Sequence, residues 1–354
     1  MSAAALAALP LQTHQRLRRL LACGDPVVTF RRIVAGERPI GGVDDRVWHA
    51  WRDVAGLDDV VAQRCAEHGI SVVSTADDSY PTALAGDPDV PAVLFFRGDL
   101  SALRRRRVGV IGTRTASLSG RNFARSLGRD LAMNGVAVVS GLARGIDVHA
   151  HRGACDGEGG AAVAVVASGL DVVYPPEHGL DFDAVAAHGV LLSEAPPGTP
   201  PETHRFPLRN RILAALSEVL VVVESRTRGG SMITVREAMK RDVTVMAVPG
   251  SPHAPVSDGT NALLKDGCGP VTDVVDVLVA LGLNSGAFRR GADTREPPTA
   301  AEREVFVACG TRAVTVDEIV MVLGLPAFDV GVLLGRLELK GWVQQVNGWW
   351  EALT

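Results

Sequence analysis

Four segments of the chain combine glycines, small hydroxyl side chains and arginines, which are the residue types that bind phosphate groups. Glycines let the backbone approach an anion closely, N–H groups at a helix start point at it, and guanidinium groups donate paired, charge-assisted hydrogen bonds. The candidate phosphate ligands are Gly112, Thr113 and Arg114, then Ser140, Gly141, Arg144 and Gly145, then Arg209, Asn210 and Arg211, and finally Gly229, Gly230 and Ser231. Each segment alone is also typical of a turn or a helix start. Arg209 and Arg211 could instead pair with Glu202 or Glu224.

A repeating pattern of strands and helices between residues 107 and 282 would position these segments. Six apolar runs occur there: VGVI (108–111), VAVVS (136–140), AAVAVVAS (161–168), VLLSEA (190–195), EVLVVVES (218–225) and VTVMAVPG (243–250). Runs without polar alternation are typical of strands buried on both faces, and the connections have room for crossover helices. We therefore predict an α/β fold with a doubly wound, mostly parallel, Rossmann-like sheet. Ligands bind such sheets at the carboxyl ends of the strands, where three of the segments begin. The fourth segment, FPLRNR (206–211), is expected to be a loop that leads into the helix before the apolar run at 218–225.

The sequence lacks the common motifs of nucleotide-binding enzymes. The first apolar run is followed by GTRTASLSG rather than by G-x-G-x-x-G, and no Gly-Lys pair exists to form a Walker A loop. No G-x-S-x-G elbow occurs. His149 and His151 are two residues apart on a predicted helix, so they point to different faces and make a poor metal pair. We predict no catalytic residues, no metal site and no cofactor.

The rest of the chain divides into further regions. Residues 1–75 read as short helices, and residues 76–284 comprise a lead-in followed by the Rossmann-like domain. Residues 285–298 have the charge, glycine and proline content of a linker. The pattern of residues 299–354 predicts three short helices and a hairpin with an Asn347-Gly348 turn. This order of elements is typical of a winged helix-turn-helix.

Composition restricts the function classes. A net charge of −4 argues against a globally basic nucleic-acid coat protein, so any polyanion site must come from local clustering of arginines. No apolar run approaches the roughly 18 to 20 residues of a membrane span, and no membrane partner is expected. The first basic residues follow the apolar start of the chain, the reverse of a signal peptide. Five scattered cysteines favour reduced thiols and a cytoplasmic location.

The order and spacing of the motifs resemble those of one protein family. VGVIGTR, VVSGLARGIDVHAH, SGLDVVYP, LLSE, FPLRNRILAALS, VLVVVESRTRGGSMITVREA and VMAVPG…SDGTNALLKDG are together similar to the signature of the DNA-processing protein A (DprA/Smf) family. The resemblance implies that Gly112, Thr113, Arg114, Ser140, Gly141 and the Arg209–Arg211 segment hold the phosphates of single-stranded DNA. It also implies a recombination mediator without established catalytic residues, RecA as a partner, a role in natural transformation, a homodimer, and a SAM-like helical region before the sheet.

Two other classes stay open from the residues alone. Phosphoribohydrolases of the lysine-decarboxylase-like family have a P-G-G-x-G-T loop near a catalytic glutamate. Here TRGGS (227–231) shares only Gly-Gly, with Glu224 and Glu237 as the nearby carboxylates. A ligand-sensing transcriptional regulator would read duplex DNA with the winged helix, but its expected recognition helix (328–340) has two basic and two acidic side chains. That balance favours a protein contact or accessory role for the winged helix.

Overall fold

The computed structural model describes residues 2–87, 89–283, 295–310, 312–346 and 348–353. The chain divides into two compact units, residues 1–290 and 291–354. Most of the predicted linker, 285–298, lies outside the described residues, as does Asn347 of the predicted turn. The four described residues at the end of that linker belong to the second unit.

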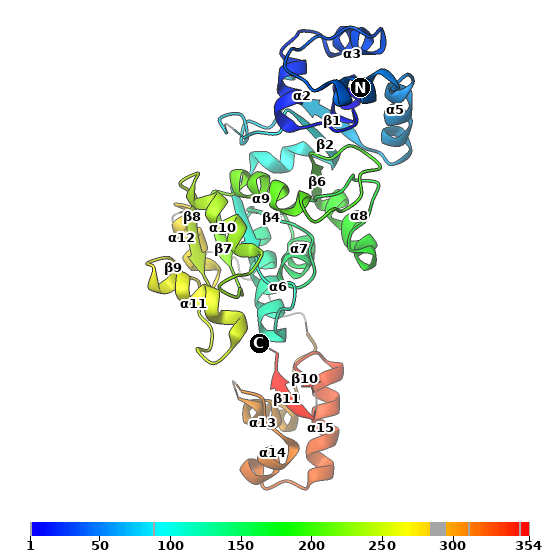
Figure 1. Ribbon diagram of the computed structural model, residues 1–354. Helices are drawn as coiled ribbons and strands as arrows, with labels where there is room; N and C mark the ends of the chain where they lie inside the picture. Colours follow the sequence, from blue (N-terminus) through cyan, green and yellow to red (C-terminus); the bar gives the residue numbers. More distant parts are fainter. Residues whose placement is uncertain (1, 88, 284–294, 311, 347, 354) are drawn as a thin grey trace. The chain divides into compact units, whose positions relative to one another are not determined.

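A nine-stranded sheet forms the centre of the first unit (Figure 1). In spatial order its strands are β1 (Ser71–Ser74), β2 (Val93–Gly98), β6 (Gly189–Ser193), β5 (Ala161–Val165), β4 (Ala137–Ser140), β3 (Arg107–Ile111), β7 (Val219–Val222), β8 (Thr244–Ala247) and β9 (Gly269–Pro270). β1 pairs antiparallel with β2, and β2 antiparallel with β6, while the remaining neighbours are parallel. The prediction of a doubly wound, mostly parallel sheet is therefore confirmed.

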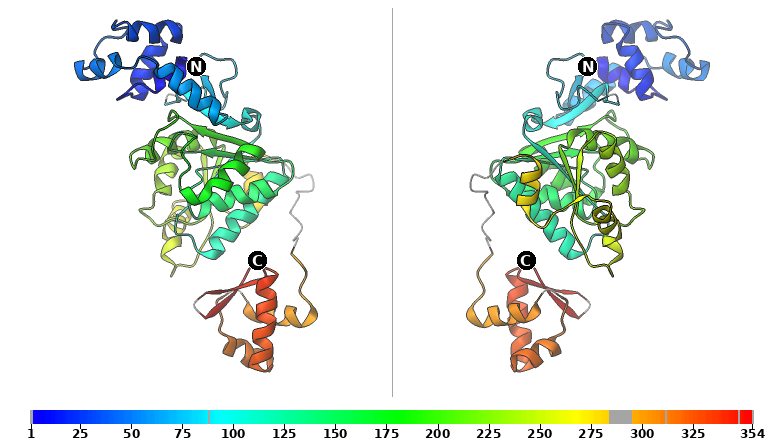
Figure 2. Two further views of the ribbon diagram at one scale, coloured as in Figure 1. Left: turned by 90° about the vertical axis from the view of Figure 1, so that its right-hand side faces the viewer. Right: turned by 90° about the vertical axis from the view of Figure 1, so that its left-hand side faces the viewer.

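Helices cover both faces of this sheet, which is why its strands are apolar throughout. One core joins alternate strand residues to α6 (Leu118–Met133), α7 (Ile146–Asp156), α8 (Gly179–His188) and α12 (Val274–Ala280). The other core joins the intervening strand residues to α9 (Arg205–Leu216), α10 (Ser231–Met239) and α11 (Asp258–Lys265). In Figure 2 the teal helix α6 lies on one side of the sheet, and the green to yellow helices α9, α10 and α11 lie on the other. Close packing on both faces holds the strand ends, and hence the loops that follow them, in fixed positions.

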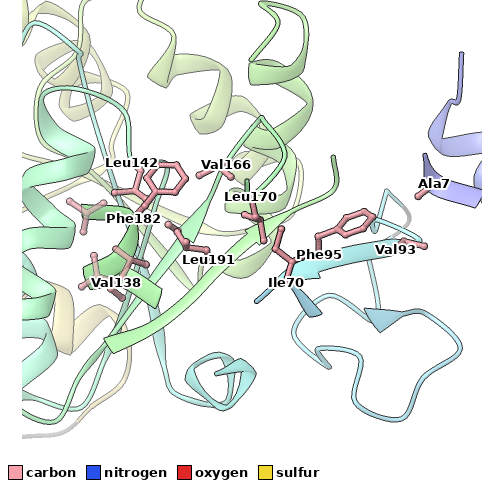
Figure 3. Close-up of a cluster of buried hydrophobic side chains, with 14 of the residues drawn as sticks. Ala7, Ile70, Val93, Phe95, Val138, Leu142, Val166, Leu170, Phe182 and Leu191 are labelled. Carbon is pink, nitrogen blue, oxygen red and sulfur yellow. The ribbon is translucent and has the colours of Figure 1, made fainter. Parts of the chain in front are cut away.

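The first 70 residues form five helices that share a core with the sheet. They are α1 (Ser2–Ala7), α2 (His14–Leu21), α3 (Pro26–Val34), α4 (Asp45–Arg52) and α5 (Leu57–Glu67). Trp51 is fully buried and donates its indole N–H to the Pro10 carbonyl at 2.7 Å. Figure 3 shows this core from Phe182 of α8 and Val138 of β4 to Phe95 and Val93 of β2. The antiparallel strands β1 and β2 thus join the helical region to the parallel sheet.

The second unit is a winged helix, as the sequence predicts. It contains α13 (Ala300–Cys309), α14 (Val316–Leu323), α15 (Ala327–Leu339), β10 (Val343–Val346) and β11 (Trp349–Ala352), with Val305, Ile319 and Leu334 at its core. Arg295 lies over the Trp342 ring at 3.7 Å and donates to the Gly341 and Leu353 carbonyls. The end of the predicted linker is therefore packed against the winged helix.

Within the described residues, no single helix is long and apolar enough to cross a membrane. In the same part of the chain, one pair of helices, α14 and α15, reaches that length and composition when taken together, and these two helices are bent by 113° from one another.

Candidate nucleic-acid interface

The order of the strands creates a crevice at the carboxyl ends of β3 and β7. From β3 the chain crosses to β4 on one side, and after β6 it returns through α9 to β7 on the other side of β3. Loops that leave neighbouring strands in opposite directions open a ligand-binding crevice between them. A pocket of about 490 Å³ lies here, between the loop after β3, the loop after β7 and the first turns of α9 and α10.

Most of the predicted phosphate ligands meet in this pocket. Its lining includes Gly112, Thr113, Arg114, Arg209, Asn210, Gly229, Gly230 and Ser231. A smaller cavity of about 40 Å³ shares Arg114, Phe206 and Arg209 with the pocket and adds Gly141 and Arg144. Segments that are more than 100 residues apart in the chain are thus brought together by the sheet edge, as expected from the strand pattern.

Arg209 lies within a helix, not in the loop that the sequence suggested. The whole FPLRNR segment belongs to α9, and the Arg209 side chain is only 7% exposed. Its guanidinium donates to the Val165 carbonyl, and its Nε is buried without a partner among the described residues. Burial lowers the pKa of Arg209 to about 10 because the charged form loses hydration. A cation with a spare N–H at a pocket wall is suited to an anionic ligand.

Gly141 is what allows the Arg209 guanidinium to lie at the pocket wall. A Cβ placed on Gly141 would be 2.0 Å from Arg209 Nη1, so any other residue here would force the guanidinium to move. The glycine therefore serves the close approach of a side chain rather than a turn.

Arg211 does not belong to the pocket. It donates to both carboxylate oxygens of Glu194 at 2.7 and 2.6 Å, and to the Asp89 carbonyl at 2.6 Å. Its partner is thus neither Glu202 nor Glu224. Residues two apart on a helix point to different faces, so Arg209 and Arg211 separate once this segment is helical. His14 of α2 also bonds Glu194 at 3.1 Å, so Arg211 helps to attach the first helices to the end of β6.

Arg114 is one of the exposed cations of the pocket. It follows β3, lines both cavities, and places its guanidinium 4.9 Å from the centre of the Phe206 ring. Phe206 in turn contacts Tyr174, with ring centres 5.7 Å apart. A cation above an aromatic pair provides a phosphate donor next to a surface on which a base can pack.

Ser140 and Gly145 support the loop after β4 and do not line either cavity. The Ser140 hydroxyl donates to the Val110 carbonyl at 2.6 Å inside the sheet. Gly145 has φ 77°, and a Cβ there would be 2.3 Å from the Thr113 carbonyl oxygen. The fully buried Leu142 also has a positive φ, 51°, which L-residues rarely adopt. This loop is held in a strained shape by its packing, as loops at binding sites often are.

Sequence reasoning missed Asp147, Arg226 and Arg228 as pocket residues. The two arginines flank Thr227 in the loop after β7, and both are exposed at the pocket. The sequence does contain a signal for these two arginines, because they lie between the end of an apolar run and Gly229. Asp147, in the first turn of α7, accepts the Gly141 N–H at 3.2 Å, and burial raises the pKa of this carboxyl.

The pocket is electropositive. Five arginines line the two cavities among the described residues, against the single carboxylate of Asp147. Arg144 is partly compensated, because it pairs with Glu177. The net charge of the chain does not reveal this cluster.

Glu224 has a structural role at the start of α6. It is 8% exposed and accepts the Ser117 N–H at 2.9 Å as well as the Ser117 hydroxyl. A Cβ on Gly120 would touch its carboxylate at 2.4 Å. Glu237 likewise pairs with Lys240 and Arg241. Neither carboxylate lines the pocket, which disfavours the phosphoribohydrolase alternative.

No cluster of three or more metal-ligating side chains occurs in the described part of the chain. The two histidines of α7 bond to backbone oxygens, His149 to Gly145 at 2.8 Å and His151 to Val163 at 3.1 Å.

Comparison with known families identifies the chain. The family model described as DNA recombination-mediator protein A matches residues 71–282, which contain the whole sheet and the pocket. The chain belongs to the DprA/Smf family. The model of the DprA winged helix domain matches residues 291–348, so both units are those of the family. The chain is thus a DNA-processing protein of the recombination-mediator class.

Individual relatives agree with the family assignment. A Mycobacterium tuberculosis protein that carries the DprA name is 35% identical over 356 residues, covering 96% of this chain and 90% of the relative. The X-ray structure of DprA from Streptococcus pneumoniae is 32% identical, with a TM-score of 0.66 over 78% of this chain and 95% of that one. DprA of Helicobacter pylori, whose structure is described as showing a unique single-stranded DNA binding mode, is 29% identical with a TM-score of 0.54. It covers 60% of this chain and 95% of its own.

Proposed function

We propose that this chain binds single-stranded DNA in the arginine-lined pocket at the carboxyl ends of β3 and β7, and that it does so as a recombination mediator. The observation that carries the proposal is the convergence of arginines from four segments: four line this pocket, Arg144 lines the adjoining smaller cavity, and the described lining of the two contains only one carboxylate. The Helicobacter pylori relative supports the choice of single strands as the ligand.

The pocket suits one nucleotide of a flexible strand. Arg114, Arg226 and Arg228 are exposed and can reach phosphates, and Gly229 and Gly230 of the β7–α10 loop line the pocket at the start of α10. Phe206 and Tyr174 offer an apolar surface beside Arg114. A base can use that surface only when it is unstacked, which a single strand permits and a duplex does not. Binding then depends on phosphate and stacking contacts, and it has little dependence on base sequence.

The proposed activity is non-catalytic. The carboxylates nearest the strand-end loops are engaged in structural bonds, and the buried Asp147 has arginines and backbone N–H groups as neighbours rather than a nucleophile. A turnover of nucleotides near 1 per second or more that is abolished by Glu224→Gln contradicts this part of the proposal.

We further propose that the DNA-bound protein loads RecA and acts as a homodimer in the cytoplasm, during DNA uptake and natural transformation. The resemblance of the sequence motifs to the DprA/Smf family supports RecA as the partner, and the five scattered cysteines support a cytoplasmic location. The winged helix is assigned an accessory role. Lys340, one of the two basic residues of its expected recognition helix, pairs with Glu296 and Glu302 at 2.9 Å each and is occupied.

A competition experiment tests the DNA ligand. The protein is titrated against a fluorescent single strand at stated salt, and unlabelled single strand, random duplex and free nucleotides are added as competitors. We expect the single strand to compete best, independently of sequence, and the affinity to fall steeply with salt because phosphate neutralisation releases counterions. A specific duplex that competes better than a random single strand would transfer the DNA contact to the winged helix.

A further inference from the structure

Asp147 is an acidic group placed where an anion is expected to bind. Its side chain is 7% exposed at the pocket wall, and it is the single carboxylate among the described lining residues. It accepts the backbone N–H groups of Gly141 and Ala143 in the loop after β4. Those same N–H groups and the neighbouring arginines are the natural donors for a phosphate. Asp147 therefore competes with the ligand that the rest of the pocket favours.

The charged groups that act on Asp147 come from other elements. Arg209 of α9 and Arg114 of the β3–α6 loop both stabilise its ionised form electrostatically. Gly141 lies between Asp147 and Arg209. Its N–H donates to the Asp147 carboxylate, and its Cα is so close to the Arg209 guanidinium that a Cβ would not fit between them. From the β7–α10 loop, Arg226 and Arg228 line the same pocket.

The nearby histidines are engaged with other partners. On α7 itself, His149 and His151 bond to the Gly145 and Val163 carbonyls. His178, which follows β5, bonds to the Leu142 carbonyl in the same loop at 3.0 Å. None of the bonds found for them in the described residues reaches the Asp147 carboxylate, so its charge is balanced by arginines.

A bound phosphate removes that balance. Burial already raises the pKa of Asp147, and the arginine charges and backbone N–H groups act against this rise. When a phosphate takes up the charge of Arg209 and Arg114, it withdraws this support and adds a like charge nearby. Both changes raise the pKa of Asp147 further and favour its neutral form.

We propose that Asp147 is a positioning residue that compensates Arg209 while the pocket is empty and takes up a proton when a DNA phosphate binds. This inference rests on the proposed single-strand binding and couples that binding to the uptake of one proton by Asp147. No bond other than that to the proton is made, and the proton comes from solvent or buffer. In the empty pocket the ionised carboxylate compensates the charge of Arg209. In the occupied pocket the protonated carboxyl can donate a hydrogen bond.

Linkage sets the direction of the effect. Because the pKa of Asp147 is higher in the occupied pocket than in the empty one, affinity rises as pH falls through the occupied-state pKa. It stops rising below the empty-state pKa, and between the two it changes by up to about tenfold per pH unit.

The test compares the full-length protein with Asp147→Asn, in which the side chain is always neutral and its oxygen can still accept the Gly141 N–H. Dissociation constants for a fluorescent oligothymidine are measured between about pH 5 and pH 8, within which buried carboxyls can titrate. Calorimetry in two buffers of different ionisation enthalpy counts the protons taken up. We expect wild type to bind more tightly at low pH with net proton uptake, and Asp147→Asn to bind at least as tightly, without uptake.

Asp156→Asn is the matched control, because it changes a carboxylate on the same helix that pairs with exposed Arg125 outside the pocket. It should keep the wild-type pH profile. The proposal is overturned if Asp147→Asn retains that profile and proton count, or if it binds more weakly while its unfolding temperature is unchanged. Wild-type protein that binds no single strand at any pH would instead refute the proposed function itself, and the proton coupling with it.

Discussion

Replacing Arg114 by alanine separates local recognition of DNA from general electrostatic attraction. Arg114 lines both cavities and lies 4.9 Å from the Phe206 ring, and it is exposed to solvent. Its contribution is one charge-assisted bond to a phosphate, which corresponds to roughly 1 to 3 kcal/mol. The dissociation constant for a single strand should therefore rise about 5- to 150-fold. The cation–π contact with Phe206 already exists in the free protein, so its loss affects stability more than binding.

The salt dependence gives a second, independent number. Each phosphate contact that is lost should make the slope of log affinity against log salt shallower by about 0.7 for a single strand. Fluorescence anisotropy at several salt concentrations, for homopolymers and mixed sequences, measures both quantities. The loss should be uniform across sequences because the phosphate is common to all of them.

Arg125→Ala provides the control, since it removes the same charge from α6 at a side chain that pairs with Asp156 and does not line either cavity. We expect its affinity to stay within about twofold of wild type, because exposed charges beyond about a Debye length of 10 Å are largely screened. The assignment of Arg114 is refuted if a folded Arg114→Ala protein keeps the wild-type affinity and slope. It is equally refuted if Arg125→Ala loses as much.

Three further substitutions test the separation of site and scaffold. Arg211→Ala should leave the salt slope unchanged but lower the free energy of unfolding by roughly 1 to 3 kcal/mol, measured by denaturant titration, because it removes charged hydrogen bonds. Although burial opposes its ionisation, Glu194 has a pKa below its ordinary value of 4.5 owing to its bonds with His14 and Arg211. The part of the stability difference that comes from the pair with Glu194 should therefore be complete above pH 4.5 and vanish as pH falls through the lowered pKa. Gly141→Ala should weaken single-strand binding at least about tenfold with a modest loss of thermal stability, because overpacking displaces the pocket guanidinium; normal affinity would contradict the close approach. Lys340→Met should lower the unfolding temperature of the winged helix, followed by tryptophan fluorescence, with no change in single-strand affinity.

The sheet could be predicted from the sequence because its signal is local. Strands buried on both faces need apolar side chains at every position, and runs such as VGVI and AAVAV report this directly. The loops at their carboxyl ends could be assigned to one site for the same reason, since a parallel sheet brings these ends to one edge. Strand ends differ by a few residues from the expected ones, because the last apolar residues of several runs pack in the following loops.

The difference between Arg209 and Arg211 could not be predicted as easily, because it depends on where α9 begins. Pro207 lies in the first turn of this helix, a position that proline tolerates, whereas the sequence pattern places it before the helix. The partner of Arg211 is tertiary, since Glu194 follows a strand on a different part of the sheet and no spacing in the sequence connects them. Burial of Asp147 beside Gly141 is likewise visible only once the loop after β4 has its folded shape.

The antiparallel pairing of β2 with β6 has a consequence for how far the protein can be shortened. Phe95 pairs with Ser193 and Gly98 with Val190, so residues before β3 satisfy the outer backbone groups of β6. A fragment that begins at β3 would retain every pocket residue, yet β6 would become an open border strand of apolar residues with unpaired N–H and C=O groups. Such borders recruit strands from other molecules, and the fragment should aggregate rather than fold as a smaller DNA-binding protein. Truncations and fusions of this chain are therefore limited at the amino-terminal side by the need to keep β2 paired with β6, although neither strand contributes a residue to the pocket.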